Sequence, residues 1–182
     1  MSGDEEMRRC VERAKASDPD AWETLYRHAY PGLHAFARRR LAGDHLADDA
    51  VSETMARAYA GIGNFTWTGR SLEAWLYGIL RNVVSETHRA SARRDNPAQI
   101  IDLTRRLTPP EEATIASEER DEMRAAFARL DAEERELLEL RVVAGLDAEA
   151  TGEIIGKRAG AVRMAQSRAL DRLRSFLRED VR

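Results

Sequence analysis

The residues of this sequence whose types could do chemistry fall into three groups along the chain. Acids gather at Asp48, Asp49 and Glu53, close to His45. Cations and one amide follow between residues 81 and 94, and a second set of cations lies between residues 157 and 178. Clustered cations favour a polyanionic partner, whereas clustered acids favour a basic partner or a metal ion. The sequence therefore indicates binding surfaces of both signs.

These groups of residues give little indication of an enzyme. No Cys/His cluster has the spacing of zinc ligands, and a Ser-His-Asp set cannot be placed by spacing. The three acids with His45 could form a metal site, but no second acidic set completes it. Taken alone, three acids are better explained as a solvated helix face. We therefore expect a protein that is not an enzyme and that has no cofactor and no metal site.

The cysteine content and the apolar stretches indicate a compartment. A single cysteine, Cys10, cannot form an internal disulfide, and the longest apolar stretches, such as residues 75–80, are short. Residues 1–9 are acidic and polar, unlike the apolar part of a signal peptide. We expect a cytoplasmic protein without membrane insertion.

The formal net charge of −3 hides an uneven distribution of charge. Residues 156–178 contain seven basic residues and one acid, and residues 111–136 contain ten acids and four arginines. Residues 38–40 and 81–94 form two further basic patches. Such a chain would meet a polyanion on some faces and a basic partner on others, although solvated helix faces also produce charge runs.

Helices must position these groups, because Ala, Leu, Arg and Glu are abundant and prolines are few. Asp18-Pro19 predicts the start of a first helix, which Pro31 should kink or split. A second helix, marked by inward residues from Leu46 to Ala58, should stop at Gly61-Ile62-Gly63, and a long third one should run from Leu72 to a basic end at residues 88–94. Helical spacing places one set of side chains of the first helix inward: Trp22, Leu25, Tyr26, Ala29, Leu33, Phe36, Ala37 and Leu41.

A second helical region follows a segment without periodicity. Residues 108–111 have the form of a capping box, and Asp131 with Glu134 should begin another helix that Gly145 ends. Asp147 should cap a short helix, Gly156 should adopt a left-handed turn, and a basic helix should begin at Ala159. We therefore predict an all-α protein of two small helical domains, at residues 1–94 and 110–182, joined by a flexible linker at residues 95–109.

The last two helices have the pattern of a helix-turn-helix, whose second helix enters the major groove of DNA. Four residues at its start share one face, opposite Val162 and Ala169, and could meet base edges: Arg163, Met164, Ser167 and Arg168. Lys157 and Arg158, in the turn, suit phosphates. A basic amphipathic helix that is merely solvated remains the alternative at this point.

Several segments resemble a known family. Residues 126–130 (AFARL), 136–141 (ELLELR), 153–156 (EIIG) and 160–163 (GAVR) are similar to region 4 of the extracytoplasmic-function (ECF) group of sigma-70 factors. Residues 46–59 (LADDAVSETMARAY) and 72–82 (LEAWLYGILRN) resemble region 2 of the same group. Two motifs in the correct order are far more specific than one. The resemblance covers about residues 18–177.

The resemblance implies a transcription-initiation factor whose partners are core RNA polymerase and promoter DNA. Asp48, Asp49 and Glu53 would dock the clamp helices of the largest polymerase subunit, and the flap region would be a further part of the polymerase that the chain contacts. An anti-sigma factor would cover both domains. The first domain would read and open the −10 element, and Arg163, Met164, Ser167 and Arg168 would read the −35 element, flanked by Lys157 and Arg158. The side chains implied at the −10 element are Trp67, Arg70, Ser71, Arg81, Asn82, His88, Arg89, Arg93 and Arg94.

Two departures and two rival functions qualify this interpretation. Thr151-Gly152 stands where the family usually has Ile-Ala, and Asp147-Ala148 replaces the common Ser-Tyr, so the first helix of the motif should be weaker or cross more closely. A stand-alone helix-turn-helix repressor or activator would need a dimer interface or ligand pocket in the first domain. A nuclease would need a convergent set of His, Asp and Glu. We expect the initiation factor.

Overall fold

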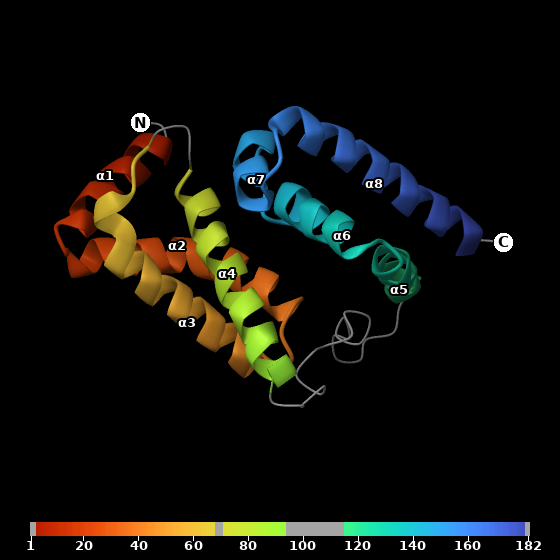
Figure 1. Ribbon diagram of the computed structural model, residues 1–182, viewed down its shortest axis with the longest axis horizontal. Coiled ribbons are helices and arrows are strands. Elements are labelled where there is room, and N and C mark those ends of the chain that lie inside the picture. Colours follow the sequence, from red (N-terminus) through yellow and green to blue (C-terminus); the bar gives the residue numbers. More distant parts are fainter. Residues whose placement is uncertain (1–2, 68–70, 94–114, 181–182) are drawn as a thin grey trace. The chain divides into compact units, whose positions relative to one another are not determined.

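The computed structural model describes residues 3–67, 71–93 and 115–180, and every regular element among them is a helix (Figure 1). The chain divides into two compact units, Met1–Ile100 and Ile101–Arg182. The predicted all-α class with two helical domains is confirmed. The predicted linker at residues 95–109, the capping box at 108–111 and the proposed domain boundaries lie outside the described residues.

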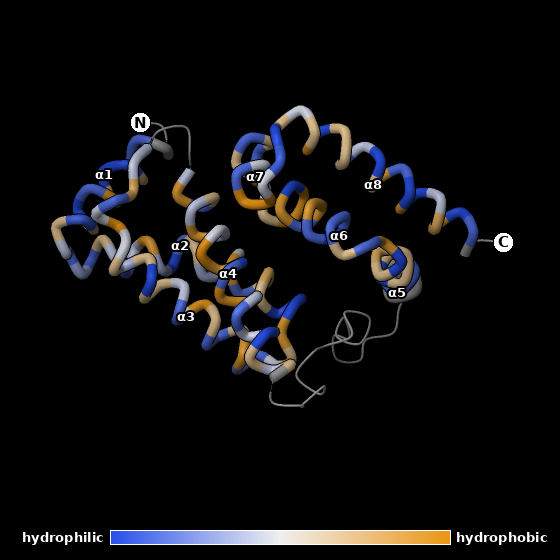
Figure 2. Tube along the Cα trace, viewed as in Figure 1, coloured by the Kyte–Doolittle hydropathy of each residue, from blue (hydrophilic) through white to orange (hydrophobic). Residues whose placement is uncertain are grey.

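Unit 1 is a helical bundle around one core. Its elements are α1 (Gly3–Lys15), α2 (Pro19–Arg38), α3 (Asp44–Gly61), the 3₁₀ turn η1 (Ile62–Asn64) and α4 (Leu72–Arg93). α2, α3 and α4 pack against one another, and α1 packs on α2. Figure 2 shows the alternation of hydrophobic and hydrophilic residues along these helices that this packing requires. The core is made of side chains such as Leu25, Leu33, Val51, Leu72 and Leu80.

The N-cap predicted at the start of α2 is present, and the helix is not split at Pro31. Asp18 Oδ1 accepts hydrogen bonds from the backbone N–H groups of Asp20 and Ala21 at 3.0 and 3.3 Å. α2 then runs unbroken through Pro31, so the expectation of a split is wrong. Ala29 and Leu33 are buried on either side of Pro31, and this packing offsets the missing backbone bond.

α1 is a helix that the sequence analysis did not predict. Its Val11 and Ala14 are 0 and 1% exposed, and Trp22 Nε1 on α2 donates a hydrogen bond to the Ala14 carbonyl at 3.0 Å. The charged residues that dominate this segment conceal the short apolar face. Val11 and Ala14 of α1 therefore belong to the core of unit 1.

Unit 2 contains α5 (Ile115–Ala128), α6 (Ala132–Leu138), the π-helical turn η3 (Glu139–Val143), α7 (Ala148–Ile155) and α8 (Ala159–Asp180). Among the residues that the structure describes, several of its buried side chains gather in two small clusters. One contains Leu130, Leu138 and Ala169, and the other contains Leu137, Ala148 and Val162. α8 contributes to both clusters, so it is fixed against α5, α6 and α7.

The predictions at Asp131–Glu134, Asp147 and Gly156 in unit 2 are confirmed. Asp131 and Glu134 form a reciprocal capping box at the start of α6. Asp147 Oδ1 accepts from the Ala150 N–H at 2.7 Å at the start of α7. Gly156 ends α7 with φ +71°, and Gly145 has φ +69°. The helix expected to run from Asp131 to Gly145 instead changes to a π-helix at Glu139.

Candidate functional site

The three predicted docking acids lie on the exposed side of α3. Asp48, Asp49 and Glu53 are exposed, whereas Ala50 and Val51 of the same helix are buried. This distribution follows from the 3.6-residue period. The arrangement agrees with the face expected from the sequence, and the role in docking stays a prediction.

Two of these acids already have partners within unit 1. Tyr30 Oη donates to Asp48 Oδ1 at 2.6 Å, and His34 Nε2 lies 3.3 Å from the same oxygen. The hydrogen bond to Asp48 raises the pKa of Tyr30 to about 12. Arg57 Nε donates to Glu53 Oε1 at 2.7 Å. Asp48 and Glu53 are therefore held in defined positions, while Asp49 projects into solvent.

An aromatic surface borders these acids, and the sequence analysis missed it. Tyr26 and Tyr30 stack at 5.4 Å between ring centroids, and Tyr30 stacks on His34 at 5.2 Å. Trp22 meets Tyr59 of α3 at 5.0 Å. Tyr26, expected inward, is 38% exposed, and Tyr59 is 55% exposed. The four-residue spacing from Trp22 to His34 was the available signal. A groove of about 430 Å³ opens here, lined by Ser17, Pro19, Trp22, Glu23, Tyr26, Met55 and Tyr59.

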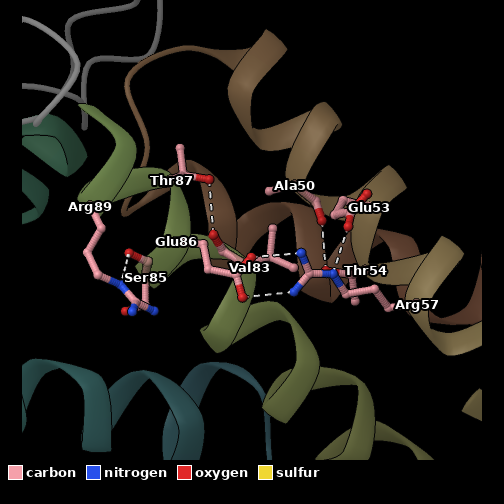
Figure 3. Close-up of polar contacts among 9 residues, drawn as sticks. All are labelled: Ala50, Glu53, Thr54, Arg57, Val83, Ser85, Glu86, Thr87 and Arg89. Carbon is pink, nitrogen blue, oxygen red and sulfur yellow. Dashed lines mark hydrogen bonds and ion pairs between the residues drawn. The ribbon is translucent and has the colours of Figure 1, made fainter. Parts of the chain in front are cut away.

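The exposed face of α4 contains the predicted strand-reading amide. Asn82 and Arg89 are exposed, and Arg81 is half-buried. Glu86, which the sequence analysis did not single out, is exposed on the same face. Arg57 of α3 reaches Glu86 with two hydrogen bonds of 3.0 and 2.7 Å (Figure 3). The predicted reading face therefore contains the acid Glu86, which is paired with the cation Arg57 of the neighbouring helix α3.

His88 differs from the other predicted phosphate contacts. Its side chain is half-buried, and burial, with help from the nearby Arg40 guanidinium, lowers its pKa below the usual 6.5. A neutral imidazole at neutral pH has little attraction for a phosphate. The side chains of Arg93 and Arg94 lie outside the described residues.

The loop before α4 is only partly described, because Arg70 lies outside the described residues. Trp67 is half-buried, with its ring 5.2 Å from the Phe65 ring and the Arg8 guanidinium 5.3 Å from its centroid. Ser71 has a structural role, because its Oγ accepts from the Ala74 N–H at 3.1 Å and caps α4. Trp67 is thus held by Phe65 and Arg8, and Ser71 is held at the start of the helix that bears Asn82.

The start of α8 presents the predicted DNA-reading face. Arg163, Met164, Ser167 and Arg168 are exposed, and Met164 is 68% exposed. Val162 is 0% exposed and anchors the opposite side. The helix-turn-helix therefore displays these four side chains together, as the sequence predicts.

Acids that the sequence analysis did not consider accompany the cations of unit 2. Arg163 Nη2 lies 2.8 Å from Glu149 Oε1 of α7, and Lys157 Nζ lies 2.6 Å from Glu133 Oε2 of α6. Arg158 is exposed in the turn. Exposed pairs of this kind are weak and exchange readily with a phosphate or a base. They reduce the positive charge of the face in the free protein.

The departure at Thr151-Gly152 has a structural explanation. A Cβ at position 152 would collide with the Lys157 carbonyl oxygen and lie 3.5 Å from Val162 Cγ2. The Lys157 N–H donates to the Gly152 carbonyl at 2.8 Å, so the turn folds back onto this glycine. Thr151 is 0% exposed, and its hydroxyl has no hydrogen-bond partner among the described residues. Position 152 therefore requires glycine because the backbone of the turn approaches it closely.

Among the residues that the structure describes, no group of three or more His, Cys, Asp or Glu side chains could hold a metal ion. No helix in this part of the chain is both long and apolar enough to cross a membrane.

Comparisons with known proteins agree with this geometry. Residues 25–94 match the family model of sigma-70 region 2, and residues 126–175 match that of sigma-70 region 4. The chain is 33% identical to the ECF RNA polymerase sigma factor BldN of Streptomyces coelicolor, covering 97% of this chain and 67% of the relative. It is 34% identical to the ECF sigma factor ShbA of Streptomyces griseus, covering 91 and 92%.

Solved structures show the same fold. The complex of CnrH with the cytosolic domain of CnrY matches with a TM-score of 0.69 at 21% identity, covering 95% of this chain and 97% of that one. The sigma factor RpoE bound to the anti-sigma factor NepR from Bartonella quintana matches with a TM-score of 0.66 at 28% identity, covering 86 and 96%. Sigma factors are non-enzymatic subunits that direct RNA polymerase in transcription initiation. The chain belongs to the ECF sigma factors of the sigma-70 family.

Proposed function

We propose that this sigma factor uses α3 to dock polymerase, α4 to read the −10 element and α8 to read the −35 element. The observation that supports this most directly is the separation of charge. Unit 1 presents exposed acids on α3 and exposed Asn82 and Arg89 on α4, while unit 2 presents exposed cations at the start of α8.

The α3 surface fits the clamp helices of the largest polymerase subunit. Asp49 offers an exposed carboxylate, and Asp48 is held by Tyr30 beside stacked aromatic rings. Basic side chains of a partner helix would meet the acids, and apolar ones would meet the groove next to Tyr26 and Tyr59. Charged groups in such a surface steer docking, so the affinity should fall as salt rises.

The α4 surface fits one strand of opened DNA. An exposed amide can donate to and accept from the edge of an unpaired base, which is the contact that Asn82 would make. Arg89, and Arg93 and Arg94 beyond it, would hold the backbone. Trp67 and Ser71 would support the loop instead of forming an open pocket, because both are engaged within unit 1.

The α8 surface fits the major groove. Arg163 would exchange Glu149 for the acceptors of a base, and Lys157 would exchange Glu133 for a phosphate. Contacts of unit 2 with the flap region would place this reading helix upstream of the −10 element.

We further propose an anti-sigma factor as the regulator and the bacterial cytoplasm as the place of action. The support is the relationship to RpoE of Bartonella quintana, which was solved with the anti-sigma factor NepR. A regulator that covers the acids of α3 and the cations of α8 would block docking and DNA reading together.

Run-off transcription from a promoter library tests the proposal. Saturating protein with active core polymerase should yield specific transcripts, and sequencing them should reveal two conserved elements. An Asn82→Ala variant should lose the downstream element and an Arg168→Ala variant the upstream one. An Arg27→Ala variant, altered on the exposed surface of α2, is the matched control. Failure of the whole library to give specific transcripts would contradict the proposed function.

A further inference from the structure

One carboxylate lies among the side chains proposed to meet DNA on α4. Glu86 stands four residues after Asn82 and three before Arg89, so these side chains leave the helix within about 60° of one another. An uncompensated carboxylate at this point would repel the phosphates of a strand read by Asn82. Glu73, the other acid of α4, is engaged elsewhere, 3.0 Å from His28. Glu86 therefore needs a partner if this face is to bind DNA.

Arg57, on the polymerase-docking helix α3, is that partner. Its Nη1 and Nη2 donate to the two carboxylate oxygens of Glu86, and its Nε donates to Glu53 (Figure 3). Paired hydrogen bonds of this kind fix the guanidinium in one plane with the carboxylate. The hydrogen bond from Arg57 lowers the pKa of Glu86, so both groups are ionised at neutral pH.

A mechanical role for this pair has weaker support than an electrostatic one. α3 and α4 already pack directly against each other, and both bury apolar side chains such as Val51 and Val83. The side chains of Arg57 and Glu86 are 38 and 49% exposed. An ion pair with this exposure adds little to stability. Its effect on the charge of the surface, in contrast, is a full elementary charge.

We propose that Arg57 belongs to the −10 DNA interface as the cation that neutralises Glu86. This inference rests on the proposed function, which places Asn82 at the DNA strand. Arg57 need not touch a base: it removes a repulsion that would otherwise stand between Asn82 and Arg89. The helix that docks polymerase thus also supplies a charge needed by the helix that reads DNA.

Three variants of the full chain distinguish an electrostatic role of the Arg57–Glu86 pair from a mechanical one: Arg57→Gln, Glu86→Gln and the double variant. Each is assembled with core polymerase and titrated against a fluorescein-labelled random single strand of about 12 nucleotides, with core alone as background. Arg57→Gln should weaken strand binding about 5-fold at low salt, and less at high salt. Glu86→Gln should bind at least as well as the wild type, and the double variant should return to within about 2-fold of it.

Each alternative outcome decides the question. Weak strand binding by Glu86→Gln or by the double variant would show that the pair positions α4, and would overturn the proposal. If Arg57→Gln does not fold, strand binding by Glu86→Gln alone tests the proposal. Unchanged binding by Arg57→Gln would overturn it as well. Polymerase affinity, measured in parallel, should not fall in Arg57→Gln, because Glu53 is released. A wild-type holoenzyme that binds no strand beyond core would instead contradict the proposed function, and this inference with it.

Discussion

The two units differ in the hydrogen bonding of a buried threonine. In unit 1, Thr54 is 0% exposed, and its hydroxyl donates to the Ala50 carbonyl at 2.7 Å. In unit 2, Thr151 is equally buried, and its hydroxyl has no partner among the described residues. Unit 2 also depends on Gly152, where no Cβ fits. The comparison indicates that unit 2, with its two small clusters, has less tolerance for change than unit 1.

The largest effect should come from Gly152→Ala. The added methyl group collides with the Lys157 backbone, so unit 2 should lose about 2 to 3 kcal/mol of stability, together with binding to the −35 element. All three tryptophans lie in unit 1, at Trp22, Trp67 and Trp75. Urea unfolding followed by tryptophan fluorescence should therefore stay unchanged, while far-ultraviolet circular dichroism shows the loss.

Gly160→Ala is the matched control for this prediction. A Cβ at position 160 meets nothing within 4 Å, so alanine should leave unit 2 unchanged or stabilise it by up to about 1 kcal/mol. If Gly152→Ala and Gly160→Ala behave alike, the tight turn is not what makes unit 2 sensitive.

Arg163→Ala should reduce discrimination at the −35 element by about 1 to 3 kcal/mol. Lys157→Ala, its counterpart in the turn, should weaken all upstream sequences nearly equally and lower the salt dependence of binding. The measurement is a titration of holoenzyme against matched and mismatched upstream duplexes. Uniform loss in Arg163→Ala would make that residue a phosphate contact.

A stabilising change tests the comparison of the threonines directly. Thr151→Val removes an unsatisfied hydroxyl and should raise the stability of unit 2 by about 1 kcal/mol. Thr54→Val removes a satisfied one and should lower the stability of unit 1 by up to about 1 kcal/mol. The same two optical probes assign each change to its unit. Equal signs for the two variants would contradict the contrast.

The smallest effect should be that of His88→Gln on DNA binding. The pKa of His88 is lowered in the folded protein, so the imidazole is neutral at about pH 7.5 and the substitution should leave the salt dependence of binding unchanged, whereas Arg89→Ala should reduce it. Below the unfolded pKa of 6.5 the unfolded chain binds more protons than the folded one. The stability contributed by neutral His88 is thus present above pH 6.5 and is lost as the pH falls through the lowered pKa of the folded protein. His88→Gln should therefore make the stability of unit 1 depend less on pH in this range.

Local chemistry explains which parts of the fold the sequence predicted well. Asp147, Gly156 and the Asp131–Glu134 box act through bonds to their own neighbours, so a short motif is enough to find them. The sequence did not predict α1, nor that α2 would continue past Pro31 without a split, because both depend on packing against other helices, which overrides local propensity. Membership of the ECF family decides against the stand-alone regulator and the nuclease.

In the candidate site too, the sequence predicted some features and not others. Helical period alone places Asn82, Arg163 and Met164 on exposed faces. It says nothing of the partners across helices, such as Arg57 with Glu86 or Arg163 with Glu149, because these pairs are 29 and 14 residues apart. The sequence shows that Thr151-Gly152 departs from the usual pattern of the family. The reason for the glycine is a backbone contact that is visible only in the folded turn.

The unbroken length of α4 has a consequence for the spacing of promoter bases. With a rise of about 1.5 Å per residue, Asn82 and Arg89 lie about 10 Å apart along the axis of α4. α4 would thus act as a ruler between one base and the backbone beyond it. Inserting a single residue between them would lengthen the helix by only about 1.5 Å but swing Arg89 about 100° around it. An insertion would therefore disturb the proposed contacts by turning Arg89 around the helix axis, far more than by changing its distance from Asn82.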